Sequence, residues 1–341
     1  MDQPIDPHFN IQRPEPLMAP SSDLETSPAS PKAQANVDQL LAHVNEKIEL
    51  LAFDEPNPAL LWRMVQSLVD PRRATRISLV DALSEIGEPA IPYLLEGLTH
   101  HIEPVVRRAC CNALMNIGDD TAVSALVHAL QADDDISVKS AAAGALAKIG
   151  APAFESIRGV LASDAASESA KGHAAWAMAT MSSEVSERLY RHMSDPSPSV
   201  RMAVVGAIAQ LAQKQMATQA AAQANKKGQT SSSPTPRKNE SARNTLSLLT
   251  EALSDASSDV RIEAAAHLAR LNAQRAYQPL VACLKDPDWE VRKAATLALG
   301  KLGNTDAIEA IAPLANDTEA AVRRVATLVT DQLIAQRTKA S

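Results

Sequence analysis

DPDWEVRKAATLALGKLG, residues 286–303, contains the pattern from which the rest of the chain can be interpreted. An Asp-Pro turn precedes a run whose apolar residues, such as Val291, Ala295 and Leu302, recur every three or four positions. This spacing predicts an amphipathic helix, and Gly303 is a typical helix stop. Because one such helix cannot bury its apolar face alone, further copies must pack against it.

Copies of this pattern recur along the chain, each with a basic residue near the start of its second helix. The spacing is 30 to 32 residues, except for one interval of 60 residues between Arg201 and Arg261. Each copy holds two helices, so the sequence predicts an all-α fold, an α-solenoid of about eight two-helix repeats. The basic positions are Arg76, Arg107, Lys139, Lys171, Arg201, Arg261, Arg292 and Arg323.

Composition divides the chain into four segments. Residues 1–35 contain seven prolines and few large apolar side chains, which predicts a disordered tail. Residues 36–213 are expected to form a cap helix and the N-terminal repeats, and residues 244–341 the C-terminal repeats. Residues 214–243 carry six basic residues against one acidic residue and predict a flexible basic loop. We interpret it as a spacer, with a latch to the acidic repeats or a contact for an acidic partner as alternatives.

The overall composition limits the classes of function. Aromatic residues make up only 3% of the chain, so a core of stacked helices built from Ala, Leu, Ile and Val is expected. The net charge of −7 disfavours a nucleic-acid partner. An odd number of cysteines without metal-ligand spacing, no basic apolar leader and no long apolar run predict a cytoplasmic protein with no metal site and no transmembrane segment.

Three of the repeated helices, VRRACCNALMNIG, VKSAAAGALAKIG and VRKAATLALGKLG, resemble the short HEAT-like repeats named after phycobilisome lyases. The resemblance covers roughly residues 58–336. The variant helix SAKGHAAWAMATM, residues 169–181, is similar to cyanobacterial members of this group. The resemblance is specific for the fold and much less specific for function, because HEAT-like arrays bind many unrelated partners.

Known members of that group attach bilins to antenna proteins, detach them or assist antenna turnover. The resemblance therefore implies a binding protein that holds a phycobiliprotein or its bilin along the solenoid groove, peripheral to antenna complexes. It implies phycobiliprotein subunits or a second HEAT-repeat subunit as partners, bilin as a substrate rather than a permanent cofactor, and a lyase-like activity if the chain is an enzyme. A non-enzymatic scaffold for an unrelated protein complex is the alternative.

No self-contained catalytic site is visible, and no catalytic residue can be named. None of the eight histidines is followed by Glu, so the His-Glu dyads of HEAT-repeat di-iron hydroxylases are absent. An acidic chain also lacks the basic groove of HEAT-like DNA glycosylases. The sequence contains no GxxxxGK[ST], HExxH or GxSxG motif.

The row of eight basic residues, which we call the cation ladder, has two interpretations. The favoured one is structural, with each cation paired to a loop aspartate of its own or a neighbouring repeat, such as Asp133, Asp164, Asp195 or Asp286. In the functional interpretation, the row donates hydrogen bonds to bilin propionates or to an acidic face of a partner. Both can hold at once.

Four further residues are candidates for partner binding. His173 and Trp176 replace small residues of the third repeat, and they either fill the core, which is favoured, or anchor a partner. Trp289 is expected to be partly exposed before a helix or to pack on the previous repeat. Cys111 is expected to face the surface beside Arg107, where a positive charge favours the thiolate, whereas its neighbour Cys110 belongs to the core.

Overall fold

The computed structural model describes residues 27–49, 57–181, 185–226 and 245–340. The described residues contain helices and no strand. The chain divides into two units, residues 1–145 and 146–341, which we describe one at a time. The division falls inside helix α7 (Ile136–Ile149), the second helix of the third repeat.

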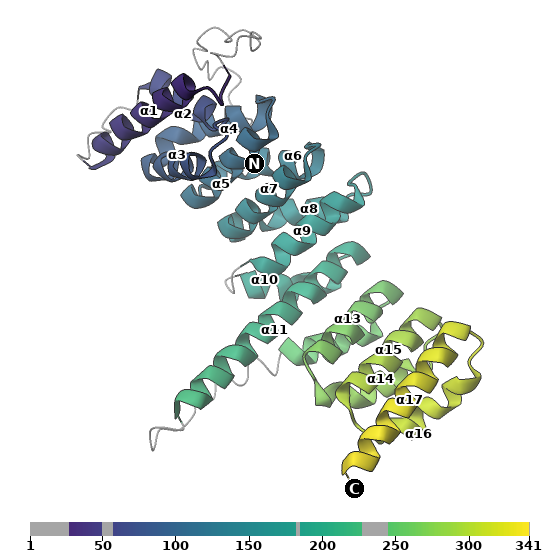
Figure 1. Ribbon diagram of the computed structural model, residues 1–341. Coiled ribbons are helices and arrows are strands. Elements are labelled where there is room, and N and C mark those ends of the chain that lie inside the picture. Colours follow the sequence, from purple (N-terminus) through teal and green to yellow (C-terminus); the bar gives the residue numbers. More distant parts are fainter. Residues whose placement is uncertain (1–26, 50–56, 182–184, 227–244, 341) are drawn as a thin grey trace. The chain divides into compact units, whose positions relative to one another are not determined.

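Unit 1 contains one leading helix followed by pairs of antiparallel helices (Figure 1). The leading helix α1 packs against α3, and the two helices of each pair pack against each other. The elements are α1 (Pro31–Glu49), the pair α2 (Pro58–Ser67) and α3 (Arg73–Ile86), the pair α4 (Ile91–His100) and α5 (Pro104–Ile117), and α6 (Val123–Ala132), which α7 follows.

Unit 2 continues the same alternation of a shorter first helix and a second helix (Figure 1). Residues 245–251 form the first helix of the pair that ends with α13. With these residues, the described part of the chain contains the eight predicted pairs. The named elements are α8 (Phe154–Ala162), α9 (Glu168–Thr180), α10 (Ser186–Arg191), α11 (Pro198–Lys226), α13 (Ser258–Arg270), α14 (Tyr277–Cys283), α15 (Trp289–Leu302), α16 (Ala307–Ile311) and α17 (Ala320–Ala340).

Helices of the same kind stack on one another within each unit. In unit 1 the first helices α2, α4 and α6 form one layer, and the second helices α3 and α5 pack together in the other. In unit 2 the second helices α9, α11, α13, α15 and α17 each pack against the next. Contacts between neighbouring repeats therefore build each unit, and the predicted solenoid class is confirmed.

The core is made mostly of aliphatic side chains, as expected from the low aromatic content. Leu114, Leu146 and Ile157 are almost completely buried, and Phe154 is the largest of the fully buried side chains. Gly118 and Gly303 end α5 and α15 in the left-handed conformation, with φ values of 76° and 71°. The predicted glycine stop is confirmed at Gly303, and Gly118 ends its helix in the same way.

Two predicted segment boundaries are wrong. Helix α11 continues to Lys226, so the loop expected over residues 214–243 does not begin at Lys214. Residues 214–226 lost the apolar period but are rich in Ala and Gln and contain no Gly or Pro, so a helix remains favourable. Helix α1 already begins at Pro31, inside the expected tail of residues 1–35, because proline is well tolerated in the first turn. The rest of both segments lies largely outside the described residues.

None of the described helices combines the length and the apolar character that crossing a membrane requires.

Candidate functional site

An arginine on the second helix of one repeat forms an ion pair with an aspartate in the loop between the two helices of the next repeat. We call this arrangement the Arg–Asp clasp. The arginine Nε and Nη2 donate to the two carboxylate oxygens, while its Nη1 donates to backbone carbonyl oxygens in the loop of its own repeat. The described residues contain four such clasps, namely Arg107–Asp133, Arg201–Asp255, Arg261–Asp286 and Arg292–Asp317.

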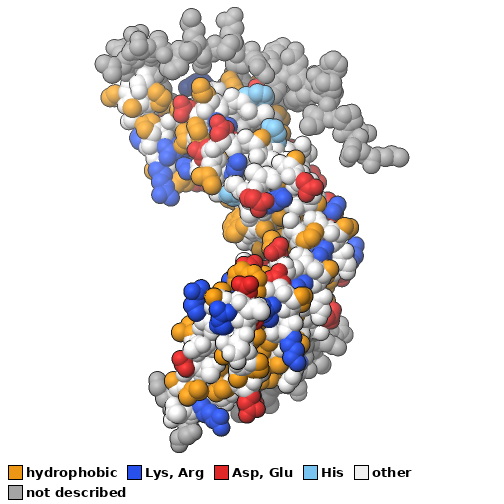
Figure 2. All heavy atoms as spheres, turned by 90° about the vertical axis from the view of Figure 1, so that its right-hand side faces the viewer, with side chains coloured by type: hydrophobic (Ala, Val, Ile, Leu, Met, Phe, Trp, Pro, Cys, Tyr) orange, Lys and Arg blue, Asp and Glu red, His pale blue; other side chains and the backbone are white. Residues whose placement is uncertain are grey.

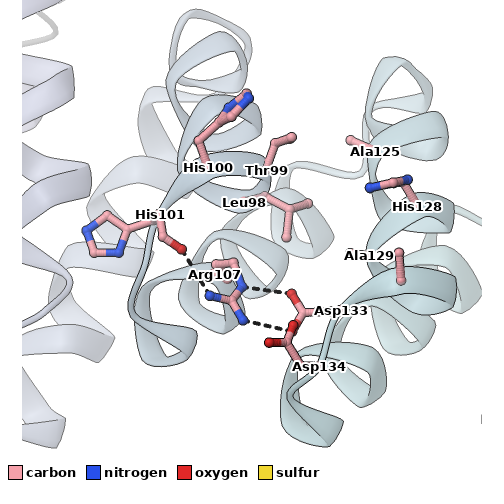
Figure 3. Close-up of a pocket in the computed structure, with 11 residues that line it drawn as sticks. Leu98, Thr99, His100, His101, Arg107, Ala125, His128, Ala129, Asp133 and Asp134 are labelled. Atoms are coloured by element: carbon pink, nitrogen blue, oxygen red, sulfur yellow. Dashed lines mark hydrogen bonds and ion pairs between the residues drawn. The ribbon is translucent and has the colours of Figure 1, made fainter.

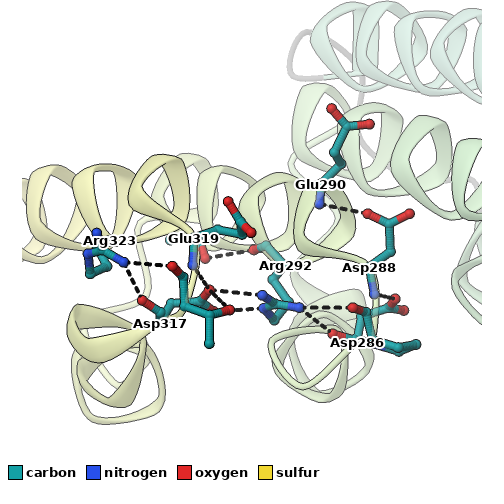
Figure 4. A network of polar contacts seen from close by, with 10 residues as sticks. Asp286, Asp288, Glu290, Arg292, Asp317, Glu319 and Arg323 are labelled. Atoms are coloured by element: carbon teal, nitrogen blue, oxygen red, sulfur yellow. Dashed lines mark hydrogen bonds and ion pairs between the residues drawn. The ribbon is translucent and has the colours of Figure 1, made fainter.

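The clasp formed by Arg292 shows the geometry (Figure 4). Its Nε lies 2.7 Å from Oδ2 of Asp317 and its Nη2 lies 2.8 Å from Oδ1. Its Nη1 lies 2.8 Å from the carbonyl oxygen of Asp286. The carboxylate is only 5% exposed, and hydrogen bonds from Arg292 lower the pKa of Asp317 to about 2. Both partners therefore stay charged at neutral pH.

The aspartate of each clasp also organises the start of the helix that follows it. Asp133 Oδ1 accepts a hydrogen bond from the backbone N–H of Asp135, and Asp317 Oδ1 accepts one from that of Glu319. The carboxylate thus joins the previous repeat to a helix start of its own repeat. The structural interpretation of the cation ladder is confirmed for Arg107, Arg201, Arg261 and Arg292.

The predicted aspartate partners were only partly correct. Asp133 and Asp286 take part in clasps, whereas Asp195 instead accepts from Arg158 and lies 3.3 Å from His192 Nδ1. Asp164 is exposed and forms no ion pair within the described residues. A sequence rule would have found Asp255 and Asp317, because three of the clasped aspartates, Asp255, Asp286 and Asp317, each stand six residues before a ladder arginine. Asp133 itself stands six residues before Lys139.

The other four ladder residues form no clasp. Lys171 lies 3.6 Å from Glu168 on its own helix. Within the described ranges, Arg323 donates only to the backbone carbonyl oxygens of Asp317 and Thr318 in its own loop. Lys139 forms no ion pair with the residues of its own unit that the structure describes. Arg76 donates through Nη1 to the carbonyl oxygen of Asp70, at 2.6 Å, and has no carboxylate partner in the described part of the chain.

Arg76 lacks a clasp because the loop of the second repeat carries histidine at the position where six of the other seven repeats carry aspartate. His101 stands six residues before Arg107, the place that Asp133 takes before Lys139. Its Nδ1 accepts a hydrogen bond from the backbone N–H of Glu103 at 3.0 Å. This contact replaces the one that Asp133 and Asp317 accept from the backbone N–H two residues later. Burial lowers the pKa of His101, so the ring is neutral at neutral pH. A neutral ring cannot supply the two anionic oxygens that a guanidinium requires.

Arg76 therefore contributes an available positive charge to a groove between α3 and α5. The groove has a volume of about 540 Å³, and none of the described side chains that line it is acidic. Arg73 and Arg108 form no hydrogen bond or ion pair with described residues, and Ile77 at its edge is 50% exposed. We call this the α3–α5 groove. It is lined by Arg73, Arg76, Ile77, Val80, Val105, Arg108, Ala109 and Asn112.

Sequence reasoning missed most of this site. Arg76 was named, but Arg73, Ile77 and Arg108 were not proposed as binding residues. Two signals could have found them: Arg73 and Arg76 share a helix face at a spacing of three residues, and His101 interrupts the column of aspartates.

A second pocket, of about 240 Å³, lies between α4 and α6 in unit 1 (Figure 3). His100, His101 and His128 line it, and the Arg107–Asp133 clasp forms its floor. The clasp engages Arg107 and Asp133 and leaves Asp134 as the third charged side chain of the lining, and no group of three potential metal ligands exists among the described residues. This pocket therefore offers no free charged pair for acid–base chemistry.

The predicted surface position of Cys111 is wrong. Its side chain is fully buried, as is that of Cys110, and burial raises the pKa of Cys111 to about 12. The effect of burial exceeds that of nearby Arg107, so the thiol is protonated and inert at neutral pH. Cys110 is confirmed as a core residue, and Cys283 is also buried.

The favoured core position is wrong for Trp176, which is 51% exposed on α9. His173, on the same helix, is half-buried and its Nδ1 donates to the carbonyl oxygen of Ser169 at 2.7 Å. Trp289 is half-buried at the start of α15, with the Lys293 ammonium 4.7 Å from its ring centre. Of these candidates, Trp176 is therefore the aromatic residue whose ring is exposed enough to contact a partner.

On the face shown in Figure 2, apolar, basic and acidic side chains are intermixed, and no continuous basic stripe is visible. Sequence models of HEAT repeats match residues 57–147, 91–170 and 246–329, and a second HEAT-repeat model matches residues 187–215. The chain is a HEAT-repeat protein. Its family supports a binding or scaffold role and specifies no partner.

Solved structures that match this HEAT-repeat protein do so at low sequence identity. An engineered protein is 19% identical, with 92% of this chain and 86% of that chain covered and a TM-score of 0.33. YibA of Escherichia coli is 19% identical, with 89% and 97% covered and a TM-score of 0.35. Yeast importin-β (Kap95p) is 15% identical, with 93% and 45% covered and a TM-score of 0.45. Among curated proteins, none matches the sequence.

Proposed function

We propose that this HEAT-repeat protein binds a partner protein and receives acidic groups of that partner in the α3–α5 groove. The observation that carries the proposal is the presence of Arg73, Arg76 and Arg108 around one groove without any described carboxylate partner. In the same chain, four other ladder arginines are neutralised by clasps. A partner's carboxylates can therefore take the place that Asp133 takes on Arg107.

The groove combines charge with apolar surface, which favours a protein segment over a small inorganic anion. Ile77 is half exposed, and Val80, Val105 and Ala109 continue the apolar lining. Guanidinium groups bind carboxylates in two-point contacts, while burial of Ile77 adds a hydrophobic contribution. The matching segment has two or more acidic residues next to an apolar one.

We further propose that the partner is a phycobiliprotein subunit or its bilin. The support is the resemblance of the repeats and of residues 169–181 to cyanobacterial proteins that handle antenna chromophores. A bilin carries two propionates and an extended apolar skeleton, which suit arginines beside aliphatic side chains. If the protein is a lyase, its contribution is to hold bilin and apoprotein together so that a cysteine of the antenna subunit adds to the chromophore.

Binding can be tested with purified phycobiliprotein subunits passed over the immobilised protein. We expect retention that falls at least about tenfold in affinity when Arg73→Gln and Arg108→Gln are combined, because each lost charge-assisted hydrogen bond contributes about 1.5–3 kcal/mol. The control combines Arg63→Gln with Arg324→Gln, which removes the same charge at exposed positions outside the groove. Equal retention by both double variants would exclude the groove as the binding site.

Co-expression with antenna subunits and a source of bilin tests the lyase-like activity. Covalently coloured subunit is expected if the protein attaches bilin. If no colour appears and no antenna subunit is retained, the phycobiliprotein proposal fails, and a scaffold for an unrelated acidic protein is the second candidate. The unclasped arginines favour that candidate equally, since they bind carboxylates whether these belong to a protein or to a bilin.

A further inference from the structure

The start of α1 is fastened next to the α3–α5 groove. Arg72, the residue just before α3, donates to the carbonyl oxygen of Gln34 at 3.2 Å and to the carboxylate of Asp38 at 3.0 Å. It also holds Asp70 through two hydrogen bonds. The next residue, Arg73, already lines the groove. Arg72 thus bonds to the start of α1 and is the sequence neighbour of Arg73, the first residue of the groove. The point at which the chain enters α1 therefore lies close to the groove.

The composition of residues 1–26 matches what the groove lacks. This segment contains five acidic residues and one basic residue, and the apolar residues Ile5, Phe9, Ile11 and Leu17 lie between them. The groove offers three arginines and the exposed Ile77. An acidic segment that carries apolar side chains is complementary to both features.

The length of the segment also allows it to reach the groove. An extended chain covers about 3.3 Å per residue, so 26 residues span up to about 85 Å, much more than the width of two neighbouring helices, each about 10 Å. A short flexible connection gives a tethered segment an effective concentration in the millimolar range. Even a contact with a dissociation constant of about 0.1 mM would then be occupied about nine-tenths of the time.

We propose that residues 1–26 of this chain dock in the α3–α5 groove and compete there with the partner. The proposal rests on the proposed function, because it makes the same groove the site of both contacts. The acidic carboxylates of the segment pair with Arg73, Arg76 and Arg108, and its apolar side chains cover Ile77. A partner must displace the segment, so the segment sets a threshold for binding and excludes weakly acidic competitors.

The test uses the full chain with a fluorescent label on a Ser22→Cys variant. The three natural cysteines are at most 7% exposed, so a maleimide dye reacts selectively with the introduced thiol. Steady-state anisotropy of the dye then measures how freely the segment moves. We expect a high anisotropy that falls toward that of a labelled peptide of residues 1–26 in about 1 M NaCl, where the Debye length is about 3 Å.

The decisive comparison is between two double variants in this labelled chain. Arg73→Gln with Arg108→Gln should lower the anisotropy at low salt, whereas Arg63→Gln with Arg324→Gln should leave it unchanged. Neither Arg73 nor Arg108 bonds to a described residue, so the helical circular dichroism should be the same in all variants. An unchanged anisotropy in the groove variant, or an equal fall in the control variant, overturns the proposal.

This assay contains no partner, so its result is independent of the proposed function. If the segment docks but no acidic partner is retained, the proposed function fails alone. If a partner is retained through the groove while the anisotropy shows no docking, only the further inference fails. If both hold, replacing Asp6, Glu15 and Asp23 by the corresponding amides in the full chain should increase partner affinity several-fold, because the competing segment is weakened.

Discussion

The guanidinium of Arg292 on α15 and the carboxylate of Asp317, in the loop before α17, meet in a two-point contact, at 2.7 and 2.8 Å. The same arginine reaches back to the carbonyl oxygen of Asp286, whose own carboxylate is held by Arg261. The clasps of the last four repeats therefore form one connected series from Arg201 to Arg323 (Figure 4 shows its C-terminal part).

Replacing Asp317 by Asn should lower the free energy of unfolding by about 1–3 kcal/mol at pH 7, because it leaves Arg292 without its anion. The pKa of Asp317 is lower in the folded state, at about 2, than its ordinary value of 3.8. The clasp therefore stabilises the fold fully above about pH 4 and loses this contribution as the pH falls toward 2. Urea unfolding between pH 7 and 3 should show the two proteins converging. Asp134→Asn, at an exposed aspartate, is the control.

Replacing Arg261 by Lys should destabilise the protein by about 1 kcal/mol although the charge is retained. A lysine ammonium cannot donate two parallel hydrogen bonds to Asp286 and a third to the carbonyl oxygen of Asp255, as Arg261 does. The melting temperature of this variant, compared with that of Arg324→Lys at an exposed position, measures the difference. Equal melting temperatures would mean that charge alone, and not the forked geometry, holds the repeats together.

Truncation of Leu146 to Ala should lower the free energy of unfolding by about 2–5 kcal/mol, because the side chain is completely buried. Leu297 is the same residue type on another second helix but is 47% exposed. Leu297→Ala should therefore cost much less. Chemical denaturation of both variants checks the helix phase, and a neutral Leu146→Ala would contradict it.

Two helical glycines should respond oppositely to alanine. A Cβ at Gly300 would lie 2.7 Å from Cγ1 of Val329, so Gly300→Ala should push α15 and α17 apart and destabilise the protein. At Gly172 a Cβ would meet no atom within 4 Å, so the higher helix propensity of alanine should stabilise the protein by up to about 1 kcal/mol. Thermal unfolding of the two variants measures both signs.

Thiol reagents should leave the native protein almost unlabelled at pH 8. Burial raises the pKa of Cys110, Cys111 and Cys283, and all three side chains are buried. Only unfolding in guanidinium chloride should release three reactive thiols per chain. Rapid labelling of Cys111 in the folded protein, located by mass spectrometry, would contradict its burial.

The repeats could be predicted because the sequence signals of each helix lie close together in the chain. A turn, an apolar period and a glycine stop lie within about 18 consecutive residues. Helices of adjacent repeats then need only align their apolar faces to pack. The end of α11 could not be predicted in this way. Its last turns lack an apolar face, so helix propensity rather than burial decides where the helix stops.

The environment of single residues was less predictable, because it depends on which neighbour covers each face. Second helices are covered by their own first helix and by second helices of neighbouring repeats, so the adjacent Cys110 and Cys111 are both buried. Trp176 stands five residues after its ladder cation, as do Leu297 and Leu328, and all three are exposed. Comparison of equivalent positions between repeats would have predicted this exposure better than residue size did.

A single substitution at His101 is enough to change the charge of the α3–α5 groove without changing any side chain that lines it. Arg76 is available because the loop of the next repeat supplies a neutral ring instead of a carboxylate. A descendant that acquired aspartate there would keep every groove side chain and still lose much of the groove's positive potential. Inheritance of a binding specificity in such arrays therefore has to be traced in the adjoining loop as well as in the residues that touch the ligand.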